Sequence, residues 1–314
     1  MIHTRGLTRV FTVRRKEKVD AVRGVDLDIE AGRLVAFLGP NGAGKSTTLR
    51  MLTTLLPPTS GSAVVAGHDV VKDPARVRSH IGYVGQRNSA GEEHRVRDEL
   101  VSQGRCYGLR PREATRRADE LLDLLDLAPL AKRLPGTLSG GQRRRLDIAL
   151  GLVHRPRLLF MDEPSTGLDP KSRAEIWQHI LRLRETYGTT LFLTTHYLEE
   201  ADSMAERVVI IDGGRIIADG TAEQLKNDLA GDHVVVTTAT AQDADKAVRV
   251  AGGTARDTTV RLRVDRAAAA LPGHLRTLDA AGVKVTAAET VRPTLDDVFL
   301  TLTGRSLTDD DLSA

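Results

Sequence analysis

Aromatic residues, cysteine and long apolar runs are all scarce in this chain of 314 residues. Phe, Trp and Tyr together make up 3% of the sequence, so a hydrophobic core has to be built mainly from Leu, Val, Ile and Ala. The single cysteine, Cys106, excludes an intrachain disulfide and a zinc site made of several thiolates. We expect Cys106 to be a small buried apolar residue in a reducing compartment.

The composition also limits the compartment and the class of partner. No stretch approaches the ~18 consecutive apolar residues of a membrane-spanning helix, and the opening MIHTRGLTRV lacks the apolar core of a signal peptide. We therefore expect a chain that is cytosolic by itself. Lys and Arg number 45 and Asp and Glu number 42, and the resulting net charge of +3 is too small to indicate an extended nucleic-acid surface.

Short apolar runs alternate with helical patterns over most of the chain, which is typical of a parallel sheet flanked by helices. The runs predicted to be strands buried on both faces are LVAFLG (34–39), IGYVGQ (81–86), RLLFMD (157–162) and TLFLTTH (190–196). The alternating VDLDIE (25–30) predicts an antiparallel strand with one face in water, and VVIIDGGRIIADG (208–220) predicts a hairpin. A helix is predicted to begin at Pro170 and to end at Gly188.

Two further regions complete the expected organisation. Residues from about 87 to 155 show helical periodicity, and we interpret them as a helical insertion into an α/β domain that spans residues 1–230. Residues 231–304 have the order β-α-β-β-α-β followed by a last helix. This predicts a small α+β domain, and the order is that of a ferredoxin-like arrangement. Residues 305–314 are expected to form a polar tail.

The segment GPNGAGKS (39–46) follows a predicted strand and precedes a predicted helix, the context that a phosphate-binding loop requires. Its glycines allow backbone N–H groups to point at phosphates, while Lys45 reaches the β- and γ-phosphates and Ser46 holds Mg²⁺. A chance match to this pattern is expected about once in a hundred chains of this length. The candidate nucleotide-binding residues here are Gly39, Pro40, Asn41, Gly42, Ala43, Gly44, Lys45, Ser46 and Thr47.

Polar residues follow three of the predicted strands. Asp162 and Glu163 end one strand, where one carboxylate can hold a metal ion and the other can orient water. Taken alone, such an acidic pair is more often a turn or a helix start, but the upstream phosphate loop reverses that preference. His196 and Gln86 each end another strand, so His196 can contact a γ-phosphate or the attacking water and Gln86 can reach the metal or the water.

The segment LSGGQRRR (138–145) places three arginines in the first turn of a predicted helix, where the helix dipole favours acidic residues. A Ser-Gly-Gly helix start with exposed N–H groups can receive an anion. Because Lys45 and its loop already serve the phosphates bound by this chain, the segment indicates a phosphate supplied by another molecule. Arg143 to Arg145 either add to the positive field there or lie on a solvated face, and the sequence leaves both interpretations open.

Taken together, these segments resemble the nucleotide-binding subunits of ABC transporters. The motifs GPNGAGKS, LSGGQ, LLFMDEP, STGLD and TTH occur in that family's order within residues 1–230. The resemblance implies a P-loop NTPase domain with a RecA-like parallel core, an antiparallel β subdomain and a helical insertion, plus the small C-terminal domain. It also implies that two copies sandwich two ATP molecules head to tail, with each phosphate loop facing the signature helix of the other copy.

The same resemblance assigns expected roles to individual residues. Glu163 would be the general base or water-polarising carboxylate, and His196, Lys45 and Gln86 complete the candidate catalytic set. The expected Mg²⁺ ligands are Ser46, Gln86 and Asp162. Ser139, Gly140, Gly141 and Gln142 would bind the nucleotide of the opposing subunit, which Asp169 would also contact. Phe11 is the nearby candidate for stacking on adenine, although an isolated Phe could equally belong to the core.

The closing segment RPTLDDVFLTLTGR (292–305) resembles the end of daunorubicin-resistance-type ATP-binding subunits. This implies an ATPase that powers drug efflux through a separate permease at the cytoplasmic face of the membrane. It also implies a second ATPase subunit, which can be an identical copy, and no nucleic-acid partner. The alternatives are an importer subunit, or a non-transport ATPase acting on DNA or the ribosome. One phosphate loop, one cysteine and no sustained heptads weigh against the last. The charged segment after Gln86 departs from the family and leaves the membrane-facing surface open.

Overall fold

The computed structural model describes residues 1–12, 18–264 and 267–305. The chain divides into two compact units, Met1–Asp219 and Gly220–Ala314. This division lies about ten residues before the expected boundary at Ala230. The reason is that the helical segments α8 (Ala222–Leu225) and η4 (Lys226–Ala230) pack with each other and with α11 (Leu295–Thr303) in the second unit.

The central sheet of the first unit has the strand order β10-β9-β3-β8-β7-β6. Its strands are β3 (Leu34–Leu38), β6 (Ile81–Val84), β7 (Leu158–Asp162), β8 (Thr190–Thr195), β9 (Arg207–Asp212) and β10 (Arg215–Gly220). The β9-β3-β8-β7-β6 pairs are parallel, and every residue of β3, β7 and β8 is buried. The apolar runs of these strands are therefore explained by helices and a second sheet that cover both faces.

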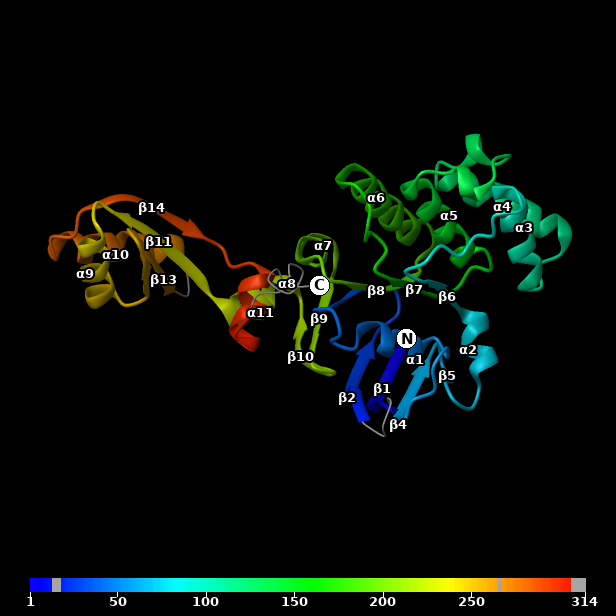
Figure 1. Ribbon diagram of the computed structural model, residues 1–314, viewed down its shortest axis with the longest axis horizontal. Helices are drawn as coiled ribbons and strands as arrows, with labels where there is room; N and C mark the ends of the chain where they lie inside the picture. Colours follow the sequence, from blue (N-terminus) through cyan, green and yellow to red (C-terminus); the bar gives the residue numbers. More distant parts are fainter. Residues whose placement is uncertain (13–17, 265–266, 306–314) are drawn as a thin grey trace. The chain divides into compact units, whose positions relative to one another are not determined.

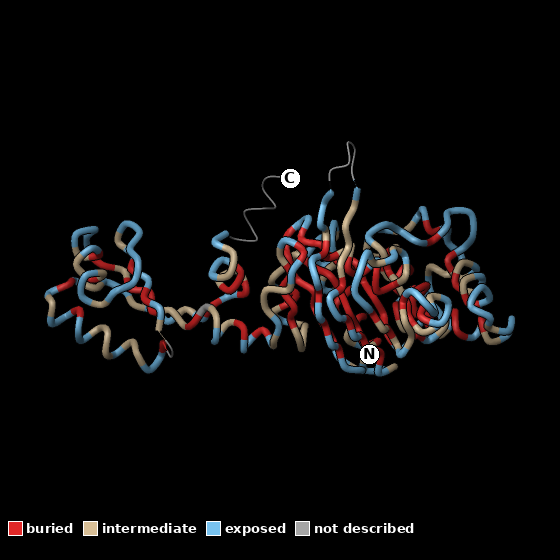
Figure 2. Tube along the Cα trace, turned by 90° about the horizontal axis from the view of Figure 1, so that it is seen from below, coloured by how far each residue is buried: buried red, intermediate tan, exposed pale blue. Residues whose placement is uncertain are grey.

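A second, antiparallel sheet has the order β2-β1-β4-β5. It is formed by β1 (Ile2–Thr12), β2 (Lys18–Ile29), β4 (Ser60–Val65) and β5 (His68–Asp69). Alternate residues of β2, among them Val25, Leu27 and Ile29, are buried, as the VDLDIE alternation predicted. They share one hydrophobic cluster with residues of the central sheet such as Phe37 and Phe160, so the two sheets enclose a common core (Figure 2).

Seven α-helices of the described part of the first unit surround the sheets. They are α1 (Lys45–Leu52), α2 (Pro74–His80), α3 (Val96–Cys106), α4 (Pro111–Leu124), α5 (Gly140–Leu152), α6 (Pro170–Tyr187) and α7 (Leu198–Met204). The short 3-10 turns η2 (Ala128–Leu130) and η3 (Pro135–Thr137) connect α4 to α5. Figure 1 shows α3, α4 and α5 gathered on the β6 side of the central sheet, where residues 87–155 were expected to form a helical insertion. No helix of the described residues is long and apolar enough to cross a membrane.

The α4 helix is attached to α5 by a buried arginine. The Arg117 guanidinium donates to the carbonyl oxygens of Leu152 (3.0 Å) and Val153 (3.3 Å), where α5 ends, and to the hydroxyl of Tyr187 (2.7 Å). A cation near the carbonyl end of a helix is stabilising, and Glu120 at 2.8 Å balances its charge.

Cys106 does not take part in this packing. It is exposed, contrary to our expectation, because α3 turns Val96, Leu100 and Gly104 inward and Cys106 outward.

The second unit contains a four-stranded antiparallel sheet in the order β12-β13-β11-β14. Its strands are β11 (Asp232–Thr238), β12 (Thr254–Arg256), β13 (Thr259–Val264) and β14 (Val285–Val291), and its helices α9 (Ala241–Ala251) and α10 (Ala267–Ala280) alternate with them along the chain. This order is that of a ferredoxin-like sheet. One apolar cluster, including Val234, Val236 and Leu278, forms its core. The expected polar tail lies almost wholly outside the described residues.

Candidate active site

The phosphate loop lies between β3 and α1, and its backbone is held tightly in place. Gly44 caps α1 with a left-handed φ of 103°, and a Cβ on it would lie 2.5 Å from the carbonyl oxygen of Ala21. A Cβ on Gly39 would collide with the backbone oxygen of Ile211 in β9. Lys45, with a side chain only 4% exposed, points its ammonium back into the loop and donates to the carbonyls of Gly39 (2.6 Å) and Pro40 (3.1 Å).

Replacing Gly39 by alanine is expected to lower the free energy of unfolding by about 1–3 kcal/mol, because the new methyl group must displace backbone atoms of β9. Chemical denaturation of the purified chain measures this. Gly136→Ala is the matched control: nothing lies within 4 Å of a Cβ there, so a change within about 0.5 kcal/mol is expected. Equal effects of the two substitutions would contradict the close approach at Gly39.

Asp162 lies at the end of β7 and meets the phosphate loop. Its Oδ1 accepts hydrogen bonds from the hydroxyls of Ser46 (3.1 Å) and Thr194 (2.6 Å). The Gln86 amide lies just after β6 and donates to the Ser46 hydroxyl at 3.4 Å. Three predicted metal-binding residues, Ser46, Gln86 and Asp162, are therefore side by side, and Thr194, which the sequence analysis did not single out, holds Asp162 in place. The only signal for Thr194 was its position two residues before His196.

Glu163 follows Asp162, and its carboxylate faces Lys45 and His196. Its Oε1 lies 3.6 Å from the Lys45 ammonium and 3.5 Å from His196 Nδ1. The His196 ring lowers the pKa of this carboxyl, partial burial opposes that change, and Lys45 lowers the pKa further, so the net result is a pKa below its ordinary value. Glu163 is therefore an ionised carboxylate at neutral pH, within reach of the loop that would hold the phosphates.

The donor set around Ser46 can be compared with what Mg²⁺ requires. A hydroxyl and a carboxylate are hard oxygen ligands, and Mg²⁺ in phosphate-transfer sites is held by one or two carboxylates together with substrate phosphates and water. Within the described ranges no group of three or more His, Cys, Asp or Glu side chains forms a metal cage. The residues thus fit a cation that shares its coordination with a bound nucleotide.

The signature segment begins α5 and makes its hydrogen bonds locally. Ser139 and Gln142 form a reciprocal capping box, in which the Ser139 Oγ accepts the Gln142 N–H at 3.3 Å. The Ser139 hydroxyl retains its own proton to donate, and the N–H groups of Gly140 and Gly141 belong to the first turn of the helix. A Cβ on Gly141 would lie 3.0 Å from the Ser172 side chain, so this segment lies against the start of α6.

Asp169 caps α6, where Ser172 donates to it from its N–H (3.0 Å) and its hydroxyl (2.7 Å). These hydrogen bonds lower the pKa of Asp169, which therefore remains ionised. Phe11 lies in β1 opposite Val19, and the Arg9 guanidinium covers its ring at 4.7 Å. The structure therefore brings Lys45, Ser46, Gln86, Asp162, Glu163 and His196 together, and places Ser139 to Gln142 beside Asp169.

The three arginines of LSGGQRRR have three different environments. Arg143 lies 3.1 Å from Glu92, and Arg145 lies 3.3 Å from the His179 ring. Arg144 is only 7% exposed, and its guanidinium donates to the backbone carbonyls of Asp162 and Pro164. Arg144 therefore neither lies on a solvated face nor adds to a positive field for an incoming phosphate. No signal in the sequence distinguished Arg144 from Arg143 and Arg145.

Comparisons with known proteins show the family to which this chain belongs. Residues 22–166 match the model of the ABC transporter family, and residues 220–303 match the C-terminal domain of DrrA1-3-like ATP-binding proteins. Daunorubicin resistance ATP-binding protein DrrA3 of Streptomyces coeruleorubidus is 45% identical over 90% of this chain and 91% of its own length. The chain is an ATP-binding subunit of the ABC transporter family. It is therefore a nucleotide-binding protein and an ATPase.

Another relative is also a drug-resistance ATP-binding protein, and a similar solved structure is an ATP-binding cassette. Daunorubicin/doxorubicin resistance ATP-binding protein DrrA of Streptomyces peucetius is 42% identical, over 98% of this chain and 94% of its own length. Among solved structures, a dimeric ATP-binding cassette in a post-hydrolysis state, bound to ADP and Pi, has 26% identity and a TM-score of 0.65 and covers 70% of this chain and 98% of its own. The P-loop ABC ATPase fold expected from the motifs is thereby confirmed, and so is the drug-resistance type of the subunit.

Proposed function

We propose that this ABC subunit hydrolyses ATP in a sandwich of two copies, each of which supplies half of each reaction centre. The supporting observation is the separation of two incomplete sites. Lys45, Ser46, Asp162 and Glu163 form one group that can bind and cleave a nucleoside triphosphate. Ser139, Gly140 and Gly141 form an anion-receiving helix start whose hydrogen bonds within the chain are local.

The roles that we propose for the residues rest on their positions and on the resemblance to the ABC family. Lys45 and the loop amides would bind the β- and γ-phosphates. Ser46, Asp162 and Gln86 would hold Mg²⁺, which would supply charge neutralisation for the phosphates. Glu163, ionised beside the phosphate loop, orients and polarises the attacking water, and His196 contacts the γ-phosphate. Ser139 and the Gly140 and Gly141 amides bind the γ-phosphate held by the other copy, and Asp169 contacts that copy. Phe11 stacks on adenine.

We further propose that the hydrolysis energises export of a drug or another hydrophobic compound through a separate permease at the cytoplasmic face of the membrane. The support is the similarity, over both units of this chain, to daunorubicin and doxorubicin resistance ATP-binding proteins. ATP favours the closed pair of subunits and hydrolysis removes that preference, so the difference in affinity drives the cycle. Co-purification of the chain with an integral membrane protein tests the assignment.

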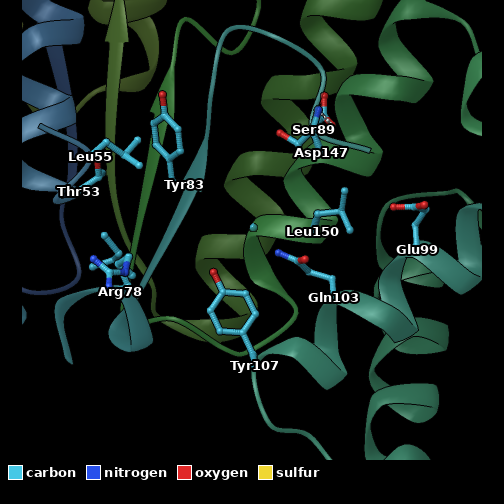
Figure 3. A pocket seen from close by; sticks show the side chains of 12 residues that line it. Thr53, Leu55, Arg78, Tyr83, Ser89, Glu99, Gln103, Tyr107, Asp147 and Leu150 are labelled. Carbon is cyan, nitrogen blue, oxygen red and sulfur yellow. Dashed lines mark hydrogen bonds between the residues drawn. The ribbon is translucent and has the colours of Figure 1, made fainter. Parts of the chain in front are cut away.

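We propose that the permease docks at a cavity of about 240 Å³, next to the segment that follows Gln86. Figure 3 shows Leu55 and Tyr83 on one wall of it and Glu99 and Gln103 on the other, with Asp147 and Ser89 at its end. The Asp147 Oδ1 accepts the N–H groups of Ser89 (2.8 Å) and Ala90 (3.3 Å), four residues after Gln86 at most. Its buried Oδ2 has no hydrogen-bond partner among the described residues, which favours a docked segment that brings a donor.

Replacing Leu55 by glutamate is expected to lower the amount of chain recovered with permease-containing membranes by about tenfold, because Leu55 is an exposed apolar side chain at this cavity. Leu134→Glu is the matched control, since Leu134 is similarly exposed but does not line the cavity. The ATPase rate of the isolated chain should change less than twofold in both variants. Equal membrane recovery of the two variants would place the permease elsewhere.

A further inference from the structure

The backbone of Glu163 has an unusual conformation. Its φ is 49°, in the left-handed region that non-glycine residues rarely adopt because Cβ then crowds the following carbonyl. Residues in such conformations persist where the surrounding structure over-determines them, and they concentrate at functional sites. The contacts that hold this backbone are therefore part of how Glu163 is placed.

One side of this backbone is held by β8. The Glu163 N–H donates to the Thr194 carbonyl (3.2 Å) and lies 3.0 Å from the Thr194 hydroxyl oxygen. The same hydroxyl donates to Asp162. These contacts fix the amide that precedes the Glu163 side chain. The Glu163 carbonyl also accepts the Thr166 N–H at 3.3 Å, and the carbonyls of Asp162, Glu163 and Pro164 all lie within reach of a donor in α5.

Arg144 of α5 donates to all three carbonyls. Its Nε donates to Pro164 O at 2.7 Å, and its Nη2 lies within hydrogen-bond distance of Asp162 O (3.2 Å) and Glu163 O (3.3 Å). Its Nη1 donates to Gly85 O at 2.6 Å, immediately before Gln86. A planar guanidinium is the side chain that can present five donors in a fixed geometry, and lysine cannot reproduce the arrangement.

We propose that Arg144 is a positioning residue for ATP hydrolysis, which keeps Glu163 in its left-handed conformation and Gln86 at the metal side of the site. The proposal rests on the proposed role of Glu163. Arg144 is buried and acts through the four carbonyls. Because its helix begins at Ser139, the segment that binds the nucleotide of the other copy and the residue that positions the local carboxylate belong to one rigid element.

The test is steady-state ATP hydrolysis, ATP affinity and ATP-dependent dimerisation of the purified full chain. Arg144→Met removes every donor but keeps an unbranched side chain. We expect kcat to fall by about 30-fold or more, because misplacing a reacting group by about 1 Å costs this much. ATP affinity should change less than about threefold, since Lys45 and its loop are untouched. Dimers should accumulate in ATP, as in Glu163→Gln.

Arg117→Met is the matched control, since Arg117 is also buried and also donates to backbone carbonyls, but at the far end of α5. It should lower the melting temperature and leave kcat of the folded protein within about threefold. Arg144→Lys keeps a buried cation and provides the test if Arg144→Met does not fold. It should retain ATP binding, with a kcat below both that of the unchanged chain and that of Arg117→Met.

Three results would overturn the proposal: unchanged kcat in both Arg144 variants, an equal loss in Arg117→Met, or a failure of the Arg144 variants to dimerise in ATP. The last would mean that Arg144 serves the Ser139 end of α5 instead. A Glu163→Gln variant measured alongside separates this failure from failure of the proposed function. If Glu163→Gln hydrolyses ATP normally, the role of Glu163 itself is wrong.

Discussion

Replacing Glu163 by glutamine is expected to lower the rate of ATP hydrolysis by about 100-fold or more while ATP-bound dimers accumulate. Glutamine has nearly the shape of glutamate but cannot accept a proton or polarise water to the same extent. The phosphate loop, Ser46 and Asp162 remain, so binding and dimerisation persist. Phosphate release measures the rate, and size-exclusion chromatography with and without ATP measures the dimers.

Two observations sharpen this experiment. His196 and Lys45 hold the pKa of Glu163 below its ordinary value, so the wild-type rate should not decline through Glu163 until the pH falls toward that lowered pKa. Thr166→Ala, which removes a hydroxyl 3.4 Å from Glu163 Oε2, is a nearby control with an expected effect of less than about fivefold. Normal turnover in Glu163→Gln would mean that another group activates the water.

Two variants that are inactive alone are expected to restore activity when mixed. Ser139→Glu places a negative charge where the other copy's γ-phosphate would bind, and Lys45→Ala removes the ammonium that binds phosphate in its own loop. A mixed dimer combines the intact loop of the first variant with the intact signature helix of the second, so one of its two sites is complete. With random pairing in a dimer of two-fold symmetry, an equal mixture should recover roughly a quarter of the wild-type rate.

The controls for this mixture are each variant alone at the same total concentration. Each should retain no more than a few per cent of the wild-type rate, roughly the loss expected when a charged phosphate contact is removed. Ser139→Glu should still bind ATP, because its own loop is intact, whereas Lys45→Ala should not. Full hydrolysis by Ser139→Glu alone would show that one copy contains a whole reaction centre.

Local sequence patterns did not predict two features of this chain, the boundary between the two units and the exposure of Cys106. The α/β order, the phosphate loop and the ends of β7 and β8 were predictable because strand burial and loop chemistry are local and periodic. Cys106 was misjudged because a lone residue has no periodicity, and only the packing of α3 decides which way it faces. The boundary moved from Ala230 to Asp219 because η4 packs with α11, more than sixty residues later in the chain.

By itself the sequence determined that this chain belongs among the ABC ATP-binding subunits, and it predicted that the candidate metal-binding and catalytic carboxylates, Asp162 and Glu163, stand next to each other. Each of these conclusions depends on residues a few positions apart, whose relation survives without knowledge of the fold. The tertiary structure alone decided that Glu163 faces Lys45 and His196, and that Arg144, of three adjacent arginines, turns inward to the carbonyls around Glu163. Those contacts join residues far apart in the chain, and only the packing of α5 against the ends of β6 and β7 brings them within hydrogen-bond distance.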